Sequence, residues 1–171
     1  MQNQAQTLIK RSYFVILVSL LLVETASGQS SSIPTPRVAI SEHHGVFNEQ
    51  AVNYKALVKE YFFAPGNSQS PAVSLITTSY IKENSNASAD RPLVFVFNGG
   101  PGASSSPLHM NALGPWRIHQ DKDSAVLKEN PYSLLDLTDL VFMDPPGTGF
   151  TRVFDSAGAA LYWDVKGDAQ L

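Results

Sequence analysis

The stretch Leu93-Val94-Phe95-Val96-Phe97-Asn98-Gly99-Gly100-Pro101-Gly102 decides the fold of this chain. Its five consecutive apolar residues do not alternate with polar ones, which indicates a strand buried on both faces, as in a parallel sheet. Two glycines and a proline then end the strand, so the chain turns sharply at the carboxyl end. Open α/β sheets place their ligands at that end of the strands.

The glycine turn is also a candidate binding element. Gly99 and Gly100 carry no side chain that would shield their backbone N–H groups, so these two amides can face a cavity. Such a pair can bind an anion or an oxyanion that develops during a reaction. The alternative is a tight turn that needs glycine only for its backbone angles.

A second apolar run, Leu140–Met143, predicts another buried strand that ends in a loop rich in glycine and proline. Between the two strands, Ser104–Pro107 supplies helix-capping residues and a proline suited to the first helical position. A short helix is expected over 108–113, ended by Gly114-Pro115. Two such strands separated by a helical segment predict an α/β fold.

The region before this unit favours antiparallel strands. Asn53–Phe63 and Ala72–Ile81 are separated by a proline- and glycine-containing turn over 65–71, which predicts a hairpin. Lys55–Tyr61 also fits a short helix, so two interpretations stay open there. The expected fold class is therefore an antiparallel hairpin that leads into a mostly parallel sheet.

The N-terminus has the order of basic, apolar and small residues that is typical of a secretory signal peptide. Lys10 and Arg11 precede the apolar stretch Phe14–Val23, and Ala26-Ser27-Gly28 offers small residues before a cleavage site. We expect a signal peptide over 1–28, a linker over 29–42 and the folded region over 43–171. The apolar stretch is short for a bilayer span, although a retained anchor is the alternative. The expected location is exported, either periplasmic or secreted, with no stable membrane anchor after cleavage.

The charge and the cysteine content of the chain limit the partners and the chemistry that it can have. The 171 residues carry a formal charge of −3, and removal of 1–28 leaves 10 basic and 14 acidic residues. No basic run remains, which makes nucleic acid and anionic membranes poor partners. The absence of cysteine excludes disulfides, thiolate metal sites and thiol catalysis, and slightly favours a bacterial periplasm.

Familiar nucleotide and catalytic motifs are missing. The glycine turn has serine where a dinucleotide-binding fingerprint needs its third glycine, and neither glycine loop has the lysine of a P-loop. No G-x-S-x-G nucleophile elbow occurs, and the serines at 104–106 fit helix caps better. Asp144, at a strand end, is expected to accept hydrogen bonds from loop N–H groups. The four histidines have no metal-ligand spacing and none is suited to be the base of a triad: His43, His44, His109 and His119.

Four ordered motifs carry a family resemblance. They are N-G-G-P-G-A-S-S from Asn98, A-L-G-P at 112–115, N-P-Y-S at 130–133 and D-L-V-F-M-D-P-P-G-T-G-F-T from Asp139. Their sequence and spacing resemble the serine carboxypeptidase family of α/β-hydrolases, from about His43 to the chain end. Ala103 stands where many members have cysteine. In this feature the chain resembles a bacterial-like branch of the family.

The resemblance implies roles for the glycine turn. Gly100 would donate one backbone N–H to the oxyanion hole, while Asn98 and Gly99 would bind the free carboxylate of a peptide substrate. The implied reaction is hydrolysis of C-terminal peptide bonds through a serine, with no cofactor and no metal. Ala112 stands where well-known members have a glutamate that helps to recognise that carboxylate, so the substrate range is in question.

The resemblance also implies an amino-terminal portion, because the family's nucleophile segment, acid and histidine lie beyond residue 171. We therefore expect no triad-dependent activity from these 171 residues alone. Two alternatives stay open: an acyltransferase of the same family, and a non-catalytic exported protein that binds acidic ligands through Asn98–Gly100.

Overall fold

The computed structural model describes residues 35–83, 91–99 and 102–169. The expected signal peptide, 1–28, and Gly100 lie outside the described residues. Among the described helices, none is long and apolar enough to cross a membrane.

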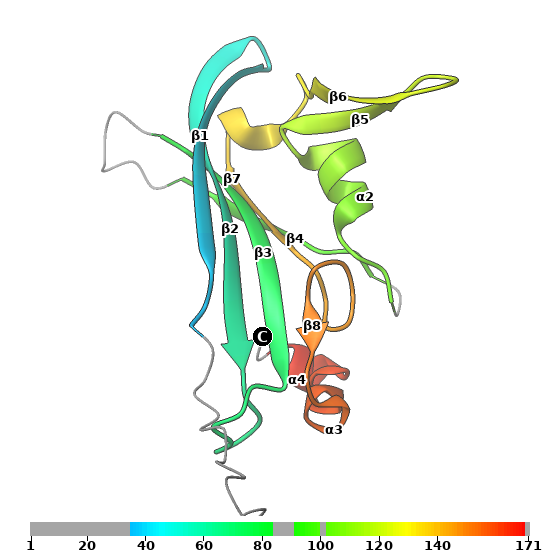
Figure 1. Cartoon of the computed structure of the whole chain (residues 1–171). Helices are drawn as coiled ribbons and strands as arrows, with labels where there is room; N and C mark the ends of the chain where they lie inside the picture. The colour runs from blue at the N-terminus through cyan, green and yellow to red at the C-terminus, as the bar shows by residue number, and fades with distance from the viewer. Residues whose placement is uncertain (1–34, 84–90, 100–101, 170–171) are drawn as a thin grey trace, which may run out of the picture. The chain divides into compact units, whose positions relative to one another are not determined.

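Six of the described strands form the main sheet, in the order β1-β2-β3-β7-β4 with β8 also paired to β3 (Figure 1). The other two, β5 (Trp116–Gln120) and β6 (Ala125–Glu129), form a separate antiparallel hairpin. The pairs β1–β2, β2–β3 and β3–β7 are antiparallel, whereas β4 runs parallel to β7. The expected antiparallel hairpin is confirmed, but the sheet it leads into is mixed among the described residues, with β4–β7 as its parallel pair, rather than mostly parallel. The bounds are β1 Val38–Phe47, β2 Gln50–Phe63, β3 Val73–Lys82, β4 Leu93–Val96, β7 Asp139–Met143 and β8 Arg152–Val153.

The β1–β2 hairpin was not expected from the sequence. Its two-residue turn places Asn48 and Glu49 at φ 48° and 65°, and these positive angles are those of a type I′ turn. An Asn-Glu pair lacks the glycine from which such a turn is normally predicted. β1 begins at Val38, so regular structure starts inside the segment 29–42 that was expected to be a linker.

The predicted β2–β3 hairpin is confirmed, and the helical alternative for Lys55–Tyr61 is wrong. β2 pairs with β1 on one side and with β3 on the other. A central strand of this kind has partners for its backbone N–H and C=O groups on both sides. Tertiary pairing therefore decides a segment whose local pattern fits either structure.

The burial of β4 differs from the prediction for this strand. Its parallel pairing with β7 is as expected, and Val96 is buried against Leu140 and Phe142. However, Phe95 and the following Phe97 are 57% and 58% exposed, so the strand is not buried on both faces. Alternate side chains point to opposite faces, and within the described residues only one of these faces is covered.

The remaining elements are short. The helix expected over 108–113 begins earlier, at Ser106, and continues as a π-helix to Leu113. A Cβ atom on Gly114 would collide with the carbonyl of His109, so glycine is needed where this helix ends. The bounds are α2 Ser106–Leu108, η1 His109–Leu113, β5 Trp116–Gln120, β6 Ala125–Glu129, η2 Leu134–Asp136, α3 Ser156–Ala159, η3 Ala160–Tyr162 and α4 Val165–Asp168.

Buried apolar side chains form three clusters along the main sheet. The first joins β1 and β2 to η2 through Phe47, Tyr54 and Leu135. The second packs the start of β3 against α3 and η3. The third joins β4 and β7 to η1, so the core that supports the helix also fixes the carboxyl ends of the two parallel strands.

Candidate active site

The two loops that follow the parallel strands lie side by side. Val96 pairs with Phe142, so the Asn98-Gly99 turn after β4 and Asp144 after β7 emerge at the same edge of the sheet. This is the edge at which α/β sheets bind ligands. The sequence therefore placed the ends of both strands at one edge of the sheet, as the structure has them.

Asp144 ties these loops together. Its Oδ1 accepts hydrogen bonds from the Ser105 backbone N–H at 2.9 Å and from the Ser105 hydroxyl at 2.7 Å. Its Oδ2 accepts from the Phe150 N–H at 3.1 Å, and the residue is only 7% exposed. The prediction that Asp144 accepts loop N–H bonds is confirmed.

Ser105 departs from the predicted helix-capping role. It occupies the N-cap position of α2, but its side chain makes no capping hydrogen bond. The hydroxyl donates to Asp144 instead, because a charged acceptor forms the stronger bond. The prediction that Ser105 caps the helix through its side chain is therefore wrong.

The loop after Asp144 is shaped around its carboxylate. Gly149 has φ 51°, in the left-handed region, and a Cβ atom there would overlap the Asp144 carboxyl group. The Thr151 hydroxyl also donates to the Asp144 carbonyl at 2.9 Å. Glycine at 149 thus meets both a conformational and a steric requirement.

The Asn98-Gly99 turn is closed by its own side chain. Asn98 Nδ2 donates to the Ser104 carbonyl at 3.2 Å, and Asn98 Oδ1 accepts from the Gly99 N–H at 3.0 Å. Asn98 is half-buried and Gly99 is exposed. The ligand-binding roles expected for Asn98, Gly99 and Gly100 stay predictions.

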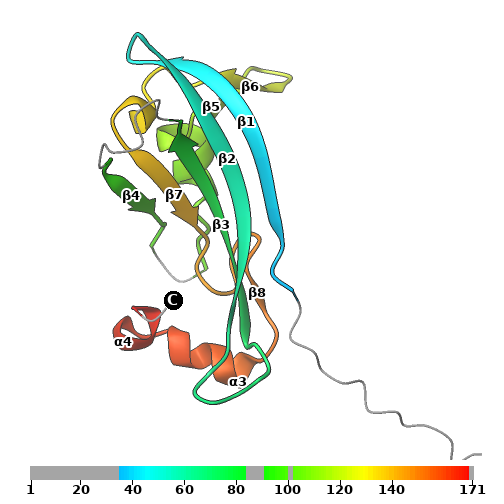
Figure 2. The ribbon, with the colours of Figure 1, turned by 90° about the vertical axis from the view of Figure 1, so that its left-hand side faces the viewer.

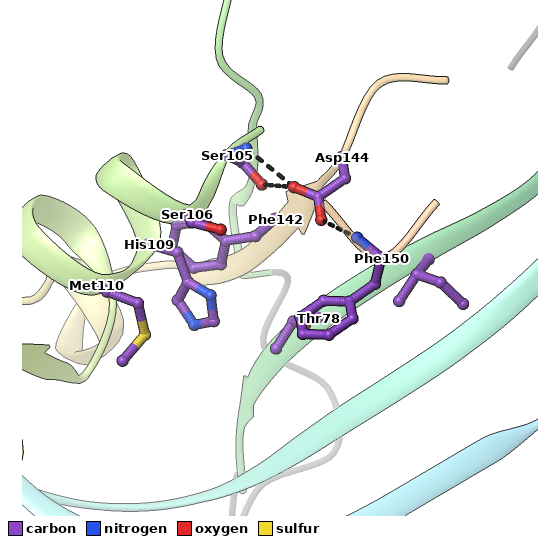
Figure 3. A pocket seen from close by; sticks show the side chains of 9 residues that line it. Thr78, Ser105, Ser106, His109, Met110, Phe142, Asp144 and Phe150 are labelled. Carbon is purple, nitrogen blue, oxygen red and sulfur yellow. Dashed lines mark hydrogen bonds between the residues drawn. The ribbon is translucent and has the colours of Figure 1, made fainter. Parts of the chain in front are cut away.

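A cavity of about 160 Å³ opens beside Asp144 (Figure 3). Asp144 and Ser105 lie along one side of it, and His109 with Met110 from η1 lies along another. Phe142 and Phe150 add apolar surface. The cavity therefore combines apolar walls with a few polar groups, but it is smaller than the roughly 300 Å³ at which small-ligand sites begin.

His109 is part of this wall but is held as a neutral group. Its Nε2 is 2.7 Å from the Tyr80 hydroxyl, and its ring stacks on Phe142 with centroids 4.3 Å apart. Burial lowers the pKa of His109, an effect that the charge of Asp144 partly opposes. Burial, with a smaller contribution from Tyr54, raises the pKa of Tyr80 to about 12. The pair is thus a bond between two neutral groups at neutral pH.

The other histidines do not join this site. Ser41 Oγ lies 2.7 Å from His43 Nε2, but both residues are exposed on β1. His44 is also on β1, and His119 is exposed on β5. Within the described ranges, no three His, Asp or Glu side chains are grouped so as to hold a metal ion.

Asn130 and Ser133 have a role that sequence reasoning missed. Asn130 is fully buried, and its Nδ2 donates to the carbonyls of Ala112 and Gly114 at 2.9 and 2.8 Å. The Ser133 hydroxyl donates to the Leu113 carbonyl at 2.9 Å. These bonds satisfy carbonyls at the end of η1, which have no partner within the helix. The N-P-Y-S motif therefore anchors the C-terminal end of η1, the helix whose His109 and Met110 line the cavity.

Comparison with known proteins identifies the family. The family model described as serine carboxypeptidase matches residues 79–160. The pheromone-processing carboxypeptidase KEX1 of Saccharomyces cerevisiae is 32% identical over 125 residues, which cover 71% of this chain and 15% of that protein. The chain belongs to the serine carboxypeptidase family. The matched segment holds the glycine turn, Asp144 and Asn130.

Two further matches are also to serine carboxypeptidases. Serine carboxypeptidase-like 36 of Arabidopsis thaliana is 46% identical over 61 residues, covering 35% of this chain and 12% of that protein. The crystal structure of the prohormone-processing carboxypeptidase KEX1(delta)p from Saccharomyces cerevisiae matches with 27% identity and a TM-score of 0.45, covering 71% of this chain and 23% of that one. The chain thus spans a small part of the length of these relatives. The expected bacterial-like branch stays a prediction.

Proposed function

We propose that this chain contributes the substrate-carboxylate and oxyanion side of a serine carboxypeptidase that hydrolyses C-terminal peptide bonds. The observation that carries the proposal is the position of Asn98-Gly99. This turn leaves β4 at the sheet edge that also holds Asp144 and its cavity. Membership of the serine carboxypeptidase family supplies the reaction class.

The hydrogen bonds of the turn are compatible with carboxylate binding. The Asn98 amide has two N–H bonds, and its bond to the Ser104 carbonyl uses one of them. The Gly99 N–H is satisfied by the neutral Asn98 oxygen. A substrate carboxylate is a stronger acceptor than that oxygen, so it would take the Gly99 N–H and the second Asn98 N–H. Gly100 would donate its N–H to the oxyanion of the tetrahedral intermediate.

The rest of the mechanism needs a serine nucleophile and a histidine base. The 171-residue sequence contains no G-x-S-x-G elbow, and none of its four histidines is suited to be the base, so neither role is assigned to a residue of this chain. Asp144 is not the triad acid in this proposal, because its carboxylate oxygens already accept bonds from Ser105 and Phe150.

Calorimetry of the full chain with paired peptides tests the carboxylate site. A peptide with a free C-terminus should bind, and the same peptide with an amidated C-terminus should bind at least tenfold more weakly, because charge-assisted hydrogen bonds are lost. Asn98→Asp is the matched variant, since it keeps the shape of the side chain and places a negative charge beside the ligand. Equal binding of acid and amide peptides by the parent chain would refute the proposal.

Ala112 favours a second candidate, acyl transfer to an alcohol. It is exposed on η1 and brings no carboxyl group to the position where well-known members have glutamate. An acceptor without a free carboxylate would not need that group. Product analysis with alcohol acceptors, using the protein that carries this chain, separates acyl transfer from hydrolysis. Binding without any turnover would instead favour the non-catalytic alternative.

Export is the proposed location, supported by the signal-like order of residues 1–28. N-terminal sequencing of the protein from its native source should begin at Gln29. A protein that retains Met1 and stays inside the cell would contradict it.

A further inference from the structure

The ten-residue strand β1 is an edge strand of the main sheet (Figure 2). In a two-residue hairpin the flanking residues, here Phe47 and Gln50, form a hydrogen-bonded pair. Odd-numbered residues of β1 therefore bond to β2, and even-numbered ones direct their N–H and C=O groups outward. In agreement, the Val46 N–H donates to Glu129 Oε1 at 3.1 Å rather than to β2. Among the described residues, no strand pairs with this outer edge.

The side chains on the outward-bonding positions form a self-complementary series. Ile40, Glu42, His44 and Val46 are all exposed and share one face of β1. If a second β1 runs antiparallel about a two-fold axis at His43, Ile40 faces Val46 and Glu42 faces His44. The axis generates each of these pairs twice. An imidazole N–H can donate to a carboxylate, so every facing pair is chemically matched.

Other registers lack this match. An axis at Glu42 places two carboxylates opposite each other, and an axis at His44 places two imidazoles opposite each other. An axis at Ser41 or at Gly45 places Glu42 opposite Ile40 or Asn48. Pairings between even and odd positions fail because the odd residues use their backbone groups for β2. The axis at His43 is thus the register that joins acid to imidazole.

We propose that β1 pairs with β1 of a second copy of this chain across a two-fold axis at His43, so that two main sheets become one. Glu42 and His44 exchange both backbone hydrogen bonds with their counterparts. The Ile40 N–H donates to the Val46 carbonyl of the other copy, while the Val46 N–H keeps its bond to Glu129. A two-fold interface of this kind is closed and stops at a dimer.

A single cysteine tests the register, because the chain contains no other. In the proposed dimer, His43→Cys places two thiols at a non-hydrogen-bonded pair whose Cα atoms are about 4.5 Å apart, within disulfide range. Ser41→Cys is the matched control, since Ser41 faces Gly45 and its own counterpart lies about 13 Å away along the strand. Mild oxidation of the full chain should give covalent dimer with His43→Cys and not with Ser41→Cys.

Sedimentation velocity of the full chain tests the charge pattern. Glu42→His and His44→Glu each place like groups opposite one another twice per dimer, and each should raise the dimer Kd roughly tenfold. The double variant Glu42→His/His44→Glu exchanges the two partners and should recover most of the parent affinity, the remaining difference reflecting loss of the Glu42–Lys55 ion pair at 3.8 Å. A general loss of stability would not be repaired by this exchange.

Three results would overturn the proposal. The first is a parent chain that sediments as a monomer at the highest concentration at which it stays in solution, because the charges on β1 would then serve to prevent edge pairing. The second is equal cross-linking by the two cysteine variants. The third is a double variant no better than the single ones.

Discussion

Removal of the Asp144 carboxylate is expected to cost about 3–4 kcal/mol of unfolding free energy. The carboxylate accepts two hydrogen bonds from Ser105, which is 4% exposed, and one from the Phe150 N–H. Asp144→Ala leaves the two buried Ser105 donors without an acceptor, whereas water can reach the exposed side of Phe150. Asp144→Asn retains one acceptor oxygen but points an amide N–H at the Phe150 N–H, so a smaller loss of about 1–2 kcal/mol is expected.

Urea unfolding of the full chain, followed by far-UV circular dichroism, measures these losses. Asp155→Ala is the matched control: the Asp155 carboxylate also accepts backbone N–H bonds, at 3.1 Å from Ala157 and 3.0 Å from Gly158. Asp155 is exposed, so its loss should cost only about 1 kcal/mol. If Asp144→Ala costs no more than Asp155→Ala at an unchanged m-value, burial does not govern the strength of these bonds and the reasoning fails.

Three further predictions concern pH and backbone shape. Hydrogen bonds from Arg37 and then Ser74 lower the pKa of Glu60 from 4.5 to about 2, so its stabilising contribution is present above pH 4.5 and is lost as the pH falls towards 2. Unfolding curves of the parent and Glu60→Gln should therefore differ near neutral pH and converge in acid; parallel curves would contradict this. Burial lowers the pKa of His109 below 6.5, so the unfolded chain takes up the proton first and stability should fall as the pH drops below 6.5. His109→Gln should flatten that part of the pH profile, and an unchanged slope would show that other groups cause it. Gly149→Ala should lower the unfolding free energy by at least about 2 kcal/mol, because its φ of 51° and the Asp144 carboxyl both oppose a Cβ atom; a smaller loss in urea unfolding would mean that the loop moves aside.

The sequence predicted the parallel strands and their loops well. Glycine and proline act locally, on the backbone angles of their own residues, so the ends of β4 and β7 could be placed without any tertiary information. The role of Asp144 also followed from its place at a strand end. By contrast, β1 and the β5–β6 hairpin were missed, because the Asn48-Glu49 turn and the exposed β5 and β6 strands lack the usual glycine and burial signals.

The candidate site was only partly visible in the sequence. The order of strands and turns predicted which edge of the sheet the two loops leave. It did not predict which side chains line the cavity. His109, Tyr80 and Phe142 come from three separate elements and meet only after the sheet has formed. Asn130 is another example: its carbonyl partners lie 16 and 18 residues earlier in the chain, so no local pattern announces them.

The amino-acid sequence by itself determined where strands stop, where the chain turns and which family the turns resemble, because these depend on neighbouring residues along the backbone. Only the tertiary structure decided that Ser105 bonds to Asp144 instead of capping its helix and that one face of β4 is exposed. Those outcomes depend on which distant groups come into contact. A hydroxyl takes the strongest acceptor within reach, and an apolar face is buried only where another element packs on it.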